Sequence, residues 1–550
     1  GEHTEIAMRF REILVLLLSL FGAASLVAQA PVEVAVITTH PEIYREALEA
    51  FTQRYGPGRL SLILADHDVD CQALSRARAV FVEGGYWSPG MAACTNTVRE
   101  MEKRGAAFTC TMPQLVQANW RVPASPRLAD APRYHNEGGA ENMIGFLAVM
   151  HNGAGGRPAI QPPALKESAA TGIYHPSAEK PFSSLTDYLA WYRSSFPERA
   201  DQPRVGLMFF RSFIARGETA TVDALIAALE RRGLVPVPAF GWPLASVEPL
   251  LTMDSRAAID TLLLVDPVMP STENARFLKK YQLHAMNLMT TSATEAEWRS
   301  GESGLPPGRL PIQVGNAERS GVSEPILIAA SAPKAEGGKL RPIPGQIQLA
   351  AARADRWVNL RRLPNERKRL ALIYYNNPPG KATLGASYLD LIPSLRNVVE
   401  RLRQEGYVTG GDLPNEEQLK RLLLLSGRNV GEYAPGELEA LVQSGHASLL
   451  SMALYNEWFH NLPEAFQKEV TAVWGSAGKS RLMTVERDGQ RYFVMPGIRL
   501  GNLLLAPQPL RGDIAKADAS THDRNTPPPH SYIAAYLYYR NYWRADALVH

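Results

Sequence analysis

The sequence contains few cysteines and no cysteine motif. Only Cys71, Cys94 and Cys110 occur in 550 residues, and none of them has the C-x-x-C spacing of a zinc site or a redox pair. The spacing therefore gives no indication of a zinc domain or of a thioredoxin-like function. The three side chains allow either one disulfide with one free thiol, as expected for an exported protein, or three buried thiols.

The sequence also lacks an excess of charge of one sign. Its 58 Lys and Arg residues against 55 Asp and Glu residues give a formal net charge of +3, and no long block carries one sign. This balance excludes the basic patch of a typical nucleic-acid-binding protein, so we expect no nucleic acid as a partner. Apolar residues make up 45% and charged residues 21%, which is usual for globular proteins. The length predicts roughly two to four domains.

Long hydrophobic runs are absent after residue 30, so the rest of the chain contains no candidate membrane span. Residues Met8–Ala30 have the order of a bacterial signal peptide: basic Arg9 and Arg11, the apolar stretch Ile13–Phe21, and a final Ala-Gln-Ala. We therefore expect a periplasmic protein. The alternatives are an uncleaved membrane anchor and a cytoplasmic protein with a signal-like start.

Three segments of the chain alternate apolar, β-prone runs with amphipathic helices. The expected strands are Val32–Thr39, Leu60–Ala65, Ala79–Val82, Val205–Phe210, Val235–Phe240 and Leu370–Tyr375. The expected helices include residues 42–55, a helix with Val222, Leu225, Ile226 and Leu229 on one face, and a helix with Leu395, Val398, Val399 and Leu402 on one face. The third segment is expected to repeat the order of the second, which is a strand, an irregular loop, an amphipathic helix and a glycine.

This alternation predicts a multidomain α/β protein with several Rossmann-like or flavodoxin-like parallel-sheet modules. A leader at 1–30, an N-terminal α/β domain at 31–165, a second α/β domain at 166–335 and a larger α/β core beginning at 336 are the expected divisions. Ligands of such sheets bind beyond the carboxyl ends of the strands. The loops after Phe210 and Tyr375 are therefore candidate site loops.

Two Gly-Lys segments resemble nucleotide-binding loops without matching them. Tyr375 stands at the first glycine position of one P-loop pattern, and Ala382 replaces its Mg²⁺-binding hydroxyl residue. In the other segment, which ends at Lys479-Ser480, Val473 occupies the first glycine position. We expect no ATP site in this chain.

Histidines gather near the C-terminus. His522, His530 and His550 occur with Asp523 around three consecutive prolines and beside a tyrosine-rich run. Imidazole and carboxylate suit Co²⁺, Fe²⁺ and Zn²⁺, and aromatic side chains suit a flat macrocycle. The three histidines are candidate metal ligands, although surface histidines explain the spacing equally well.

Nine motifs in the same order give the chain its resemblance to a known family. They are Tyr174-His175-Pro176, Tyr188–Tyr192, Arg341–Gln346, Ala350–Trp357, Leu363–Arg369, Tyr375–Lys381, Gln508–Gly512, Pro528–Tyr532 and Ala545–His550. The chain resembles the cobaltochelatase and magnesium chelatase large-subunit family from about Gly172 to its end. In that family the last motif continues into a glycine-rich segment with a further histidine and a glutamate. The abrupt stop at His550 therefore suggests a fragment, inactive alone, whose residues from 336 onward begin the chelatase core.

The resemblance implies that the chain binds a tetrapyrrole and inserts a divalent metal as substrate, with Co²⁺ expected first and Mg²⁺ or Fe²⁺ as alternatives. It also implies candidate roles for individual side chains. The catalytic candidates are His550, His530, His522 and Asp546; the metal ligands are His522, His530 and His550; and the substrate-binding candidates are Tyr375, Asn376, Arg353, Arg356, Gln508 and Arg511. Imidazoles near neutral pH can accept pyrrole protons, and arginines suit the carboxylate or amide periphery of the ring.

The family's partners conflict with the expected signal peptide. Members of the family work with AAA+ ATPase subunits in the cytoplasm or plastid, where ATP is present. Three interpretations follow: a cytoplasmic chelatase subunit with such partners; an exported, ATP-independent dechelatase; or a haem or metallo-tetrapyrrole binding protein with membrane-associated uptake partners. The first is the assignment by similarity, and the signal favours the second.

Overall fold

The computed structural model describes residues 30–550 except 39, 67–68, 85–86, 267–271, 302–303, 306–308, 337, 377–383, 385–388, 432–433, 446 and 513–524. The chain forms two compact units, Gly1–Trp357 and Val358–His550. No helix among the described residues is long and apolar enough to cross a membrane. The predicted signal peptide lies outside the described residues.

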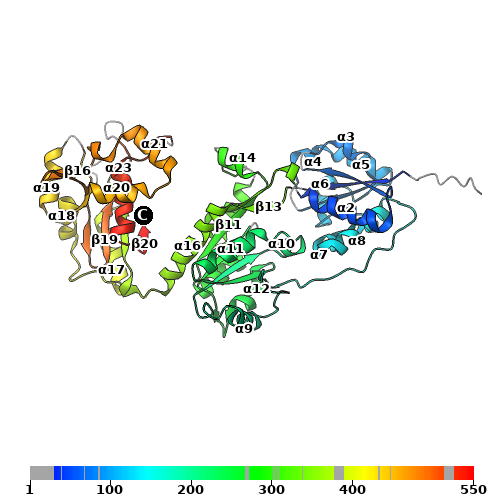
Figure 1. The fold of residues 1–550 in the computed structure, drawn as a ribbon, viewed down its shortest axis with the longest axis horizontal. Helices are drawn as coiled ribbons and strands as arrows, with labels where there is room; N and C mark the ends of the chain where they lie inside the picture. The colour runs from blue at the N-terminus through cyan, green and yellow to red at the C-terminus, as the bar shows by residue number, and fades with distance from the viewer. Residues whose placement is uncertain are drawn as a thin grey trace, which may run out of the picture. The chain divides into compact units, whose positions relative to one another are not determined.

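The first sheet is parallel and has the order β2-β1-β3-β4. Its elements are β1 (Val32–Ile37), α2 (Pro41–Tyr55), β2 (Leu60–Ala65), α3 (Cys71–Leu74), β3 (Ala79–Val82), α4 (Pro89–Ala93), α5 (Thr95–Lys103), β4 (Ala107–Cys110), α6 (Gln114–Trp120), α7 (Ala131–Glu137) and α8 (Gly139–Gly153). Alternate strand residues pack on α2 and α8 on one face and on α3, α5 and α6 on the other, in two helix layers (Figure 1). Because both faces are covered, the strands are mostly apolar, as predicted, with Glu33, Ser61 and Thr109 as polar exceptions.

Cys71 and Cys94 form a disulfide in this module, with their Cα atoms 5.3 Å apart, and Cys110 is a free buried thiol. The disulfide joins the start of α3 to the start of α5. Of the two arrangements that the sequence allows, the structure has the one disulfide and one free thiol.

The second sheet has seven strands in the order β13-β12-β11-β10-β6-β7-β5. Its elements are β5 (Gly172–Ile173), α9 (Leu185–Ser195), β6 (Arg204–Phe209), α10 (Arg211–Ala215), α11 (Ala220–Arg231), β7 (Val235–Phe240), α12 (Leu244–Leu251), β10 (Thr261–Val265), α13 (Thr272–Tyr281), β11 (Ala285–Thr291), α14 (Glu295–Ser300), α15 (Asn316–Arg319), β12 (Ser323–Ser331) and β13 (Leu340–Pro342). The strands β12, β11, β10, β6 and β7 are parallel, and β13 and β5 are antiparallel edges. A small hairpin, β8 (Thr252–Met253) and β9 (Arg256–Ala257), stands apart from this sheet, and α16 (Pro344–Arg362) runs from the first unit into the second.

The second unit contains a four-stranded sheet, β18-β19-β14-β20, and an antiparallel sheet, β15-β17-β16. Its elements are β14 (Leu370–Tyr374), α17 (Leu391–Gln404), α18 (Glu416–Ser426), α19 (Pro435–Gln443), β15 (Ser448–Ser451), α20 (Met452–His460), α21 (Glu464–Trp474), β16 (Thr484–Arg487), β17 (Gln490–Met495), β18 (Ile498–Leu500), β19 (Leu503–Pro507), α23 (His530–Leu537) and β20 (Ala547–Val549). Strand β14 is parallel to both neighbours, β19 and β20.

In this unit β14, α17 and Gly406 follow one another in the expected order, but the strand that returns beside β14 is β19, far along the chain. One expectation for this unit was wrong. Val398 is 42% exposed, whereas Leu391, Leu395 and Val399 are buried. The buried stripe follows a four-residue spacing, which leaves Val398 at its side.

Candidate functional site

Polar side chains meet at the carboxyl edge of the β14 sheet. Asn376 follows β14, Gln508 directly follows β19, and His550 directly follows β20. Because these three strands are parallel, the segments after them emerge at the same edge. The structure thus places three of the residues predicted from sequence together, at the location where α/β proteins bind ligands.

Asn429, a residue that the sequence analysis did not select, joins two of these segments. It is 2% exposed, and its backbone N–H donates to Asn376 Oδ1 at 2.8 Å. Its side-chain Nδ2 donates to the backbone oxygen of Gln508 at 2.7 Å and to that of Asn376 at 3.3 Å. Three hydrogen bonds from one buried residue therefore hold the loop after β14 against the loop after β19.

Two tyrosines of α23 lie over this edge. Tyr532 and Tyr536 are one helical turn apart, and their ring centroids are 5.0 Å apart. The Gln508 side-chain amide donates to Tyr536 Oη at 3.2 Å and to Tyr532 Oη at 3.4 Å. The His550 ring lies 6.3 Å from the Tyr536 ring and is inclined by 22° to it. Burial raises the pKa of Tyr536 to about 12, so the phenol stays neutral. The edge carries aromatic faces and neutral hydrogen-bonding groups.

The surroundings of His530 do not suit a metal ligand, because both of its ring nitrogens have hydrogen-bond partners. The residue is 1% exposed; Tyr455 Oη lies 2.7 Å from Nδ1, and the Gly475 oxygen lies 2.9 Å from Nε2. The neutral ring satisfies both contacts by accepting from the tyrosine and donating to the carbonyl. Burial lowers the pKa of His530 and therefore favours the neutral form. The hydrogen bond to Gly475 acts in the opposite direction but is the smaller effect. Here His530 is a core histidine with no free ring nitrogen.

Asp546 and His550 lie at opposite ends of β20. Asp546 Oδ2 accepts a hydrogen bond from the backbone N–H of Arg369 at 2.7 Å, and its own N–H donates to the Arg369 oxygen at 2.7 Å. These two bonds hold the amino end of β20 against β14. Asp546 therefore stabilises the sheet and does not orient a histidine at the carboxyl edge.

The remaining predicted residues are dispersed. Tyr375 is 43% exposed beside Asn376, and Arg511 is exposed just beyond Gln508. Arg353 and Arg356 are exposed on α16 within the first unit, where Arg353 Nε bonds Glu324 Oε2 at 2.8 Å. His522, Asp523 and the segment from Asn377 to Ala382 lie outside the described residues, among which no group of three or more His, Cys, Asp or Glu side chains could hold a metal.

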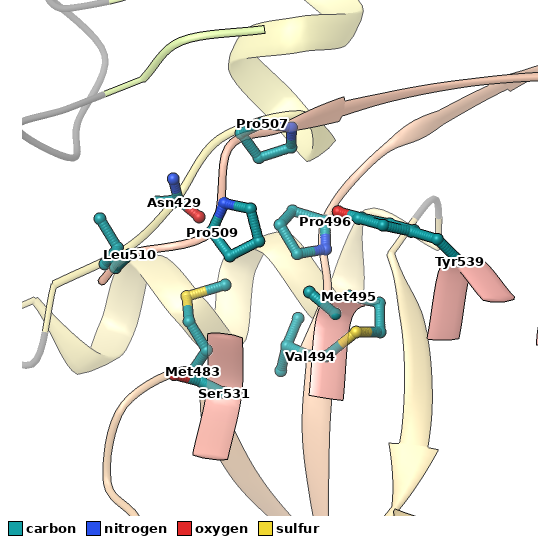
Figure 2. A pocket seen from close by; sticks show the side chains of 11 residues that line it. Asn429, Met483, Val494, Met495, Pro496, Pro507, Pro509, Leu510, Ser531 and Tyr539 are labelled. Carbon is teal, nitrogen blue, oxygen red and sulfur yellow. The ribbon is translucent and has the colours of Figure 1, made fainter. Parts of the chain in front are cut away.

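A small cavity lies beneath the polar edge. Figure 2 shows Asn429, the prolines Pro496, Pro507 and Pro509, and Tyr539 around it, with Ser531 nearby. Its volume is about 10 Å³, room for about one water molecule. A ligand of macrocycle size cannot enter this cavity and would have to bind on the outer side of the loops.

A larger hollow of about 460 Å³ lies between α19 and the β16–β17 hairpin. Its basic lining consists of Arg481, which is exposed, and Arg491, whose guanidinium donates to the backbone oxygens of Gly478 and Ser480. This volume is in the range of small-molecule sites, and guanidinium groups suit carboxylates.

A second polar cluster, also missed from sequence, lies at the carboxyl edge of β1 and β3 in the first sheet. Glu83, 7% exposed, accepts from Thr38 Oγ1 and pairs with Arg216, and the nitrogens of His135 and His40 lie 3.5 and 3.8 Å from its Oε1. Burial would raise the pKa of Glu83, but Arg216 and the two histidines hold it well below its usual range. Part of the signal was present: Glu83 directly follows the predicted strand Ala79–Val82, whereas Thr38 was placed inside the predicted strand Val32–Thr39, which in the structure ends at Ile37.

The comparisons with known proteins agree with this architecture. The family model described as CobN/Magnesium Chelatase matches residues 132–550. The chain belongs to this family. The aerobic cobaltochelatase subunit CobN of Pseudomonas aeruginosa is 27% identical over an alignment of 558 positions, which covers 95% of this chain and 42% of that protein. The chloroplastic magnesium-chelatase subunit ChlH of Oryza sativa is 26% identical over 404 residues, which cover 69% of this chain and 27% of that protein.

A solved structure shows the same fold. The catalytic subunit of cobaltochelatase from Mycobacterium tuberculosis matches with a TM-score of 0.56 and 22% identity, over 94% of this chain and 42% of that chain. It confirms the predicted mixed α/β fold with several parallel-sheet modules. This chain of the CobN/magnesium chelatase family spans less than half the length of these relatives.

Proposed function

We propose that this chain provides tetrapyrrole-binding surface to the large subunit of a cobaltochelatase-type metal chelatase, with Co²⁺ as the first-choice metal substrate. The observation that carries this proposal is the group formed by Tyr532, Tyr536, Gln508 and His550 at the carboxyl edge of the β14 sheet. Two aromatic faces and a neutral amide suit a flat ring with a polar periphery.

His550 is the residue that we propose for proton or metal transfer at this edge. Insertion removes two protons from the pyrrole nitrogens, and an imidazole can accept a proton near neutral pH. His550 is exposed and stacks near Tyr536, whereas His530 is fully bonded inside the core. His522 remains a proposed metal ligand, and AAA+ ATPase subunits remain proposed partners.

A visible absorbance titration with metal-free and cobalt-loaded tetrapyrroles tests binding. Replacing both tyrosines (Tyr532→Leu with Tyr536→Leu) should weaken binding about tenfold, because each aromatic contact contributes about 0.5–1.5 kcal/mol. Tyr542→Leu is the matched control, since Tyr542 is 57% exposed and its ring packs on that of Tyr538. Unchanged affinity in the double variant, or no spectral shift with the unaltered protein, would contradict the proposal.

The hollow lined by Arg481, in the same unit, is a second candidate part of the tetrapyrrole-binding surface. If the carboxylate periphery of the ring reaches it, Arg481→Ala should weaken binding of a carboxylate-bearing tetrapyrrole and leave binding of its methyl ester unchanged. Unchanged binding of both ligands would confine the binding surface to the tyrosine edge.

We also propose that the protein is exported, as its N-terminal sequence predicts. The Cys71–Cys94 disulfide supports this location, because disulfides persist in oxidising compartments and are rare in the cytoplasm. Alkylation of denatured cell fractions with and without reductant should label only Cys110 in unreduced periplasmic protein. Labelling of all three cysteines without reductant would favour the cytoplasm.

An exported protein meets essentially no ATP, so the alternative function is an ATP-independent dechelatase or a carrier for haem-like ligands. Following the absorbance titration over time separates these functions. Slow conversion between free-base and metallated bands without ATP would indicate the dechelatase, and saturable binding without conversion would indicate a carrier or a subunit that needs its ATPase.

A further inference from the structure

The loop after α18, residues Gly427 to Gly431, is polar in sequence but buried in the structure. Arg428 is 4% exposed and Asn429 is 2% exposed. Tyr374, the last residue of β14, donates its hydroxyl hydrogen bond to the Gly427 oxygen. A Cβ atom at Gly427 would overlap that hydroxyl, so a larger residue here would displace the Tyr374 side chain. The loop is thus fixed directly against the end of β14.

Within this loop, Asn429 is the residue that reaches both neighbouring strand ends. Its backbone N–H bonds the Asn376 side chain, and its side-chain amide bonds the main chain of Gln508. Gln508 in turn bonds the two tyrosine hydroxyls. The hydrogen bonds therefore run without interruption from the β14 loop through Asn429 and Gln508 to Tyr532 and Tyr536.

We propose that Asn429 is a positioning residue for the tetrapyrrole-binding surface. It sets the separation of the β14 and β19 loops and, through Gln508, the placement of the tyrosine pair. Asn429 lies beneath these groups and acts through them, without contacting the ligand. The role of Asn429 in binding rests on the proposed function, whereas its role in fixing the loops does not.

Asn429→Asp is the sharpest test because it conserves size and exchanges a donor for an acceptor. The carboxylate would face the carbonyl oxygens of Gln508 and Asn376, and repulsion should separate the loops. At pH 8 we expect tetrapyrrole binding about tenfold weaker than that of the unaltered protein. Burial raises the pKa of such a carboxyl, so binding should recover as the pH falls and the protonated group donates again. A defect caused by the change of side-chain shape alone would not recover.

Asn502→Asp is the matched control at the opposite edge of the same strands. Asn502 precedes β19, its side-chain amide donates to the Glu366 oxygen at 3.1 Å, and its backbone oxygen accepts from Leu370 N at 3.0 Å. The same chemical change there should alter affinity by less than about twofold, because its bond lies at the amino edge.

Hydrogen–deuterium exchange of the 503–512 segment decides the positioning role without any ligand. Asn429→Asp should speed exchange there relative to the unaltered protein at pH 8, and less so at pH 5. Unchanged exchange overturns the proposal. Faster exchange with unaltered affinity overturns the link to binding, and absence of binding by the unaltered protein overturns the proposed function alone. If the Asp variant does not fold, Asn429→Ser, which keeps a shorter donor, is measured in the same way.

Discussion

Two sheets of this protein present polar residues at their carboxyl edges, and the two edges are built differently. At the β1–β3 edge the buried Glu83 carboxylate is paired with the half-buried Arg216, and two histidines face the same carboxylate. At the β14–β19 edge the groups are amides, phenols and an imidazole, and Tyr375 and His550 are exposed. The carboxyl edges of the two sheets thus carry two different kinds of polar group.

The β1–β3 edge has its charges satisfied by the neighbouring module, since Arg216 follows α10 of the second sheet domain. Glu137 of α7 and Arg211 of α10 add a second pair between these modules at 2.6 Å. This edge holds two modules together within the first unit. The β14–β19 edge retains exposed aromatic and hydrogen-bonding groups, as a binding surface must.

The largest effect on the free energy of unfolding should come from removing the Arg216–Glu83 ion pair at the β1–β3 edge. Arg216→Ala leaves the buried Glu83 carboxylate without its main partner, which typically costs about 3–5 kcal/mol in the free energy of unfolding. Urea unfolding measures this loss. Lys103→Ala, which removes an exposed pair with Glu100, should have no measurable effect. A loss as small as that of the control would mean that the cluster is hydrated and contributes little.

A smaller effect on the free energy of unfolding is expected from the buried Tyr455–His530 hydrogen bond in the second unit. Tyr455→Phe removes the hydroxyl that donates to His530 Nδ1 and leaves that nitrogen buried without a donor, at a cost of about 1–3 kcal/mol. Tyr492→Phe is the control, because its hydroxyl bonds Gln490 at the surface. Thermal unfolding of both variants is the measurement. Equal stabilities would show that the His530 ring has another arrangement in solution.

The smallest effect is a difference in pH dependence between the edges. The lowered pKa of His530 means that the folded state binds its proton less readily than the unfolded state, so stability is full above about pH 6.5 and falls below it. The lowered pKa of Glu83 gives a contribution that is full above about pH 4.5 and is lost as the pH falls further.

Unfolding free energies measured between about pH 2 and 8 test this difference. His530→Asn should remove the loss that begins near pH 6.5, and Glu83→Gln should remove the loss at the acidic end. His40, His135 and Glu218 also lie near the charged cluster, so the comparison is made with Glu83→Gln rather than with a histidine variant. Identical pH profiles for the two variants would remove the distinction between the edges.

Many of the residues at these two edges could be predicted from sequence, because apolar runs show where strands end. The apolar runs identified β1, β3, β6, β7 and β14, and the residues after them identified Asn376. The family resemblance contributed Gln508 and His550. The positions of strands in the sequence do not show which distant segment pairs with which strand. The pairing of β14 with β19 is the example.

Asn429 could not be predicted for the same reason. It lies in a short loop without a motif, and its importance arises only from the pairing of β14 with β19. His530 was selected because histidines cluster in sequence, yet its neighbours in space are a tyrosine and a backbone carbonyl. Glu83 was within reach, since an acidic residue after four apolar strand residues is unusual.

The order of strands around β14 also has a consequence during synthesis. Leu370 of β14 pairs with Leu503 of β19 and with Ala547 of β20. At the usual rate of translation, roughly 7 to 27 s pass between the emergence of β14 and that of its first partner. During that interval an apolar strand has both edges open, which makes it a target for chaperones and a point where aggregation can begin.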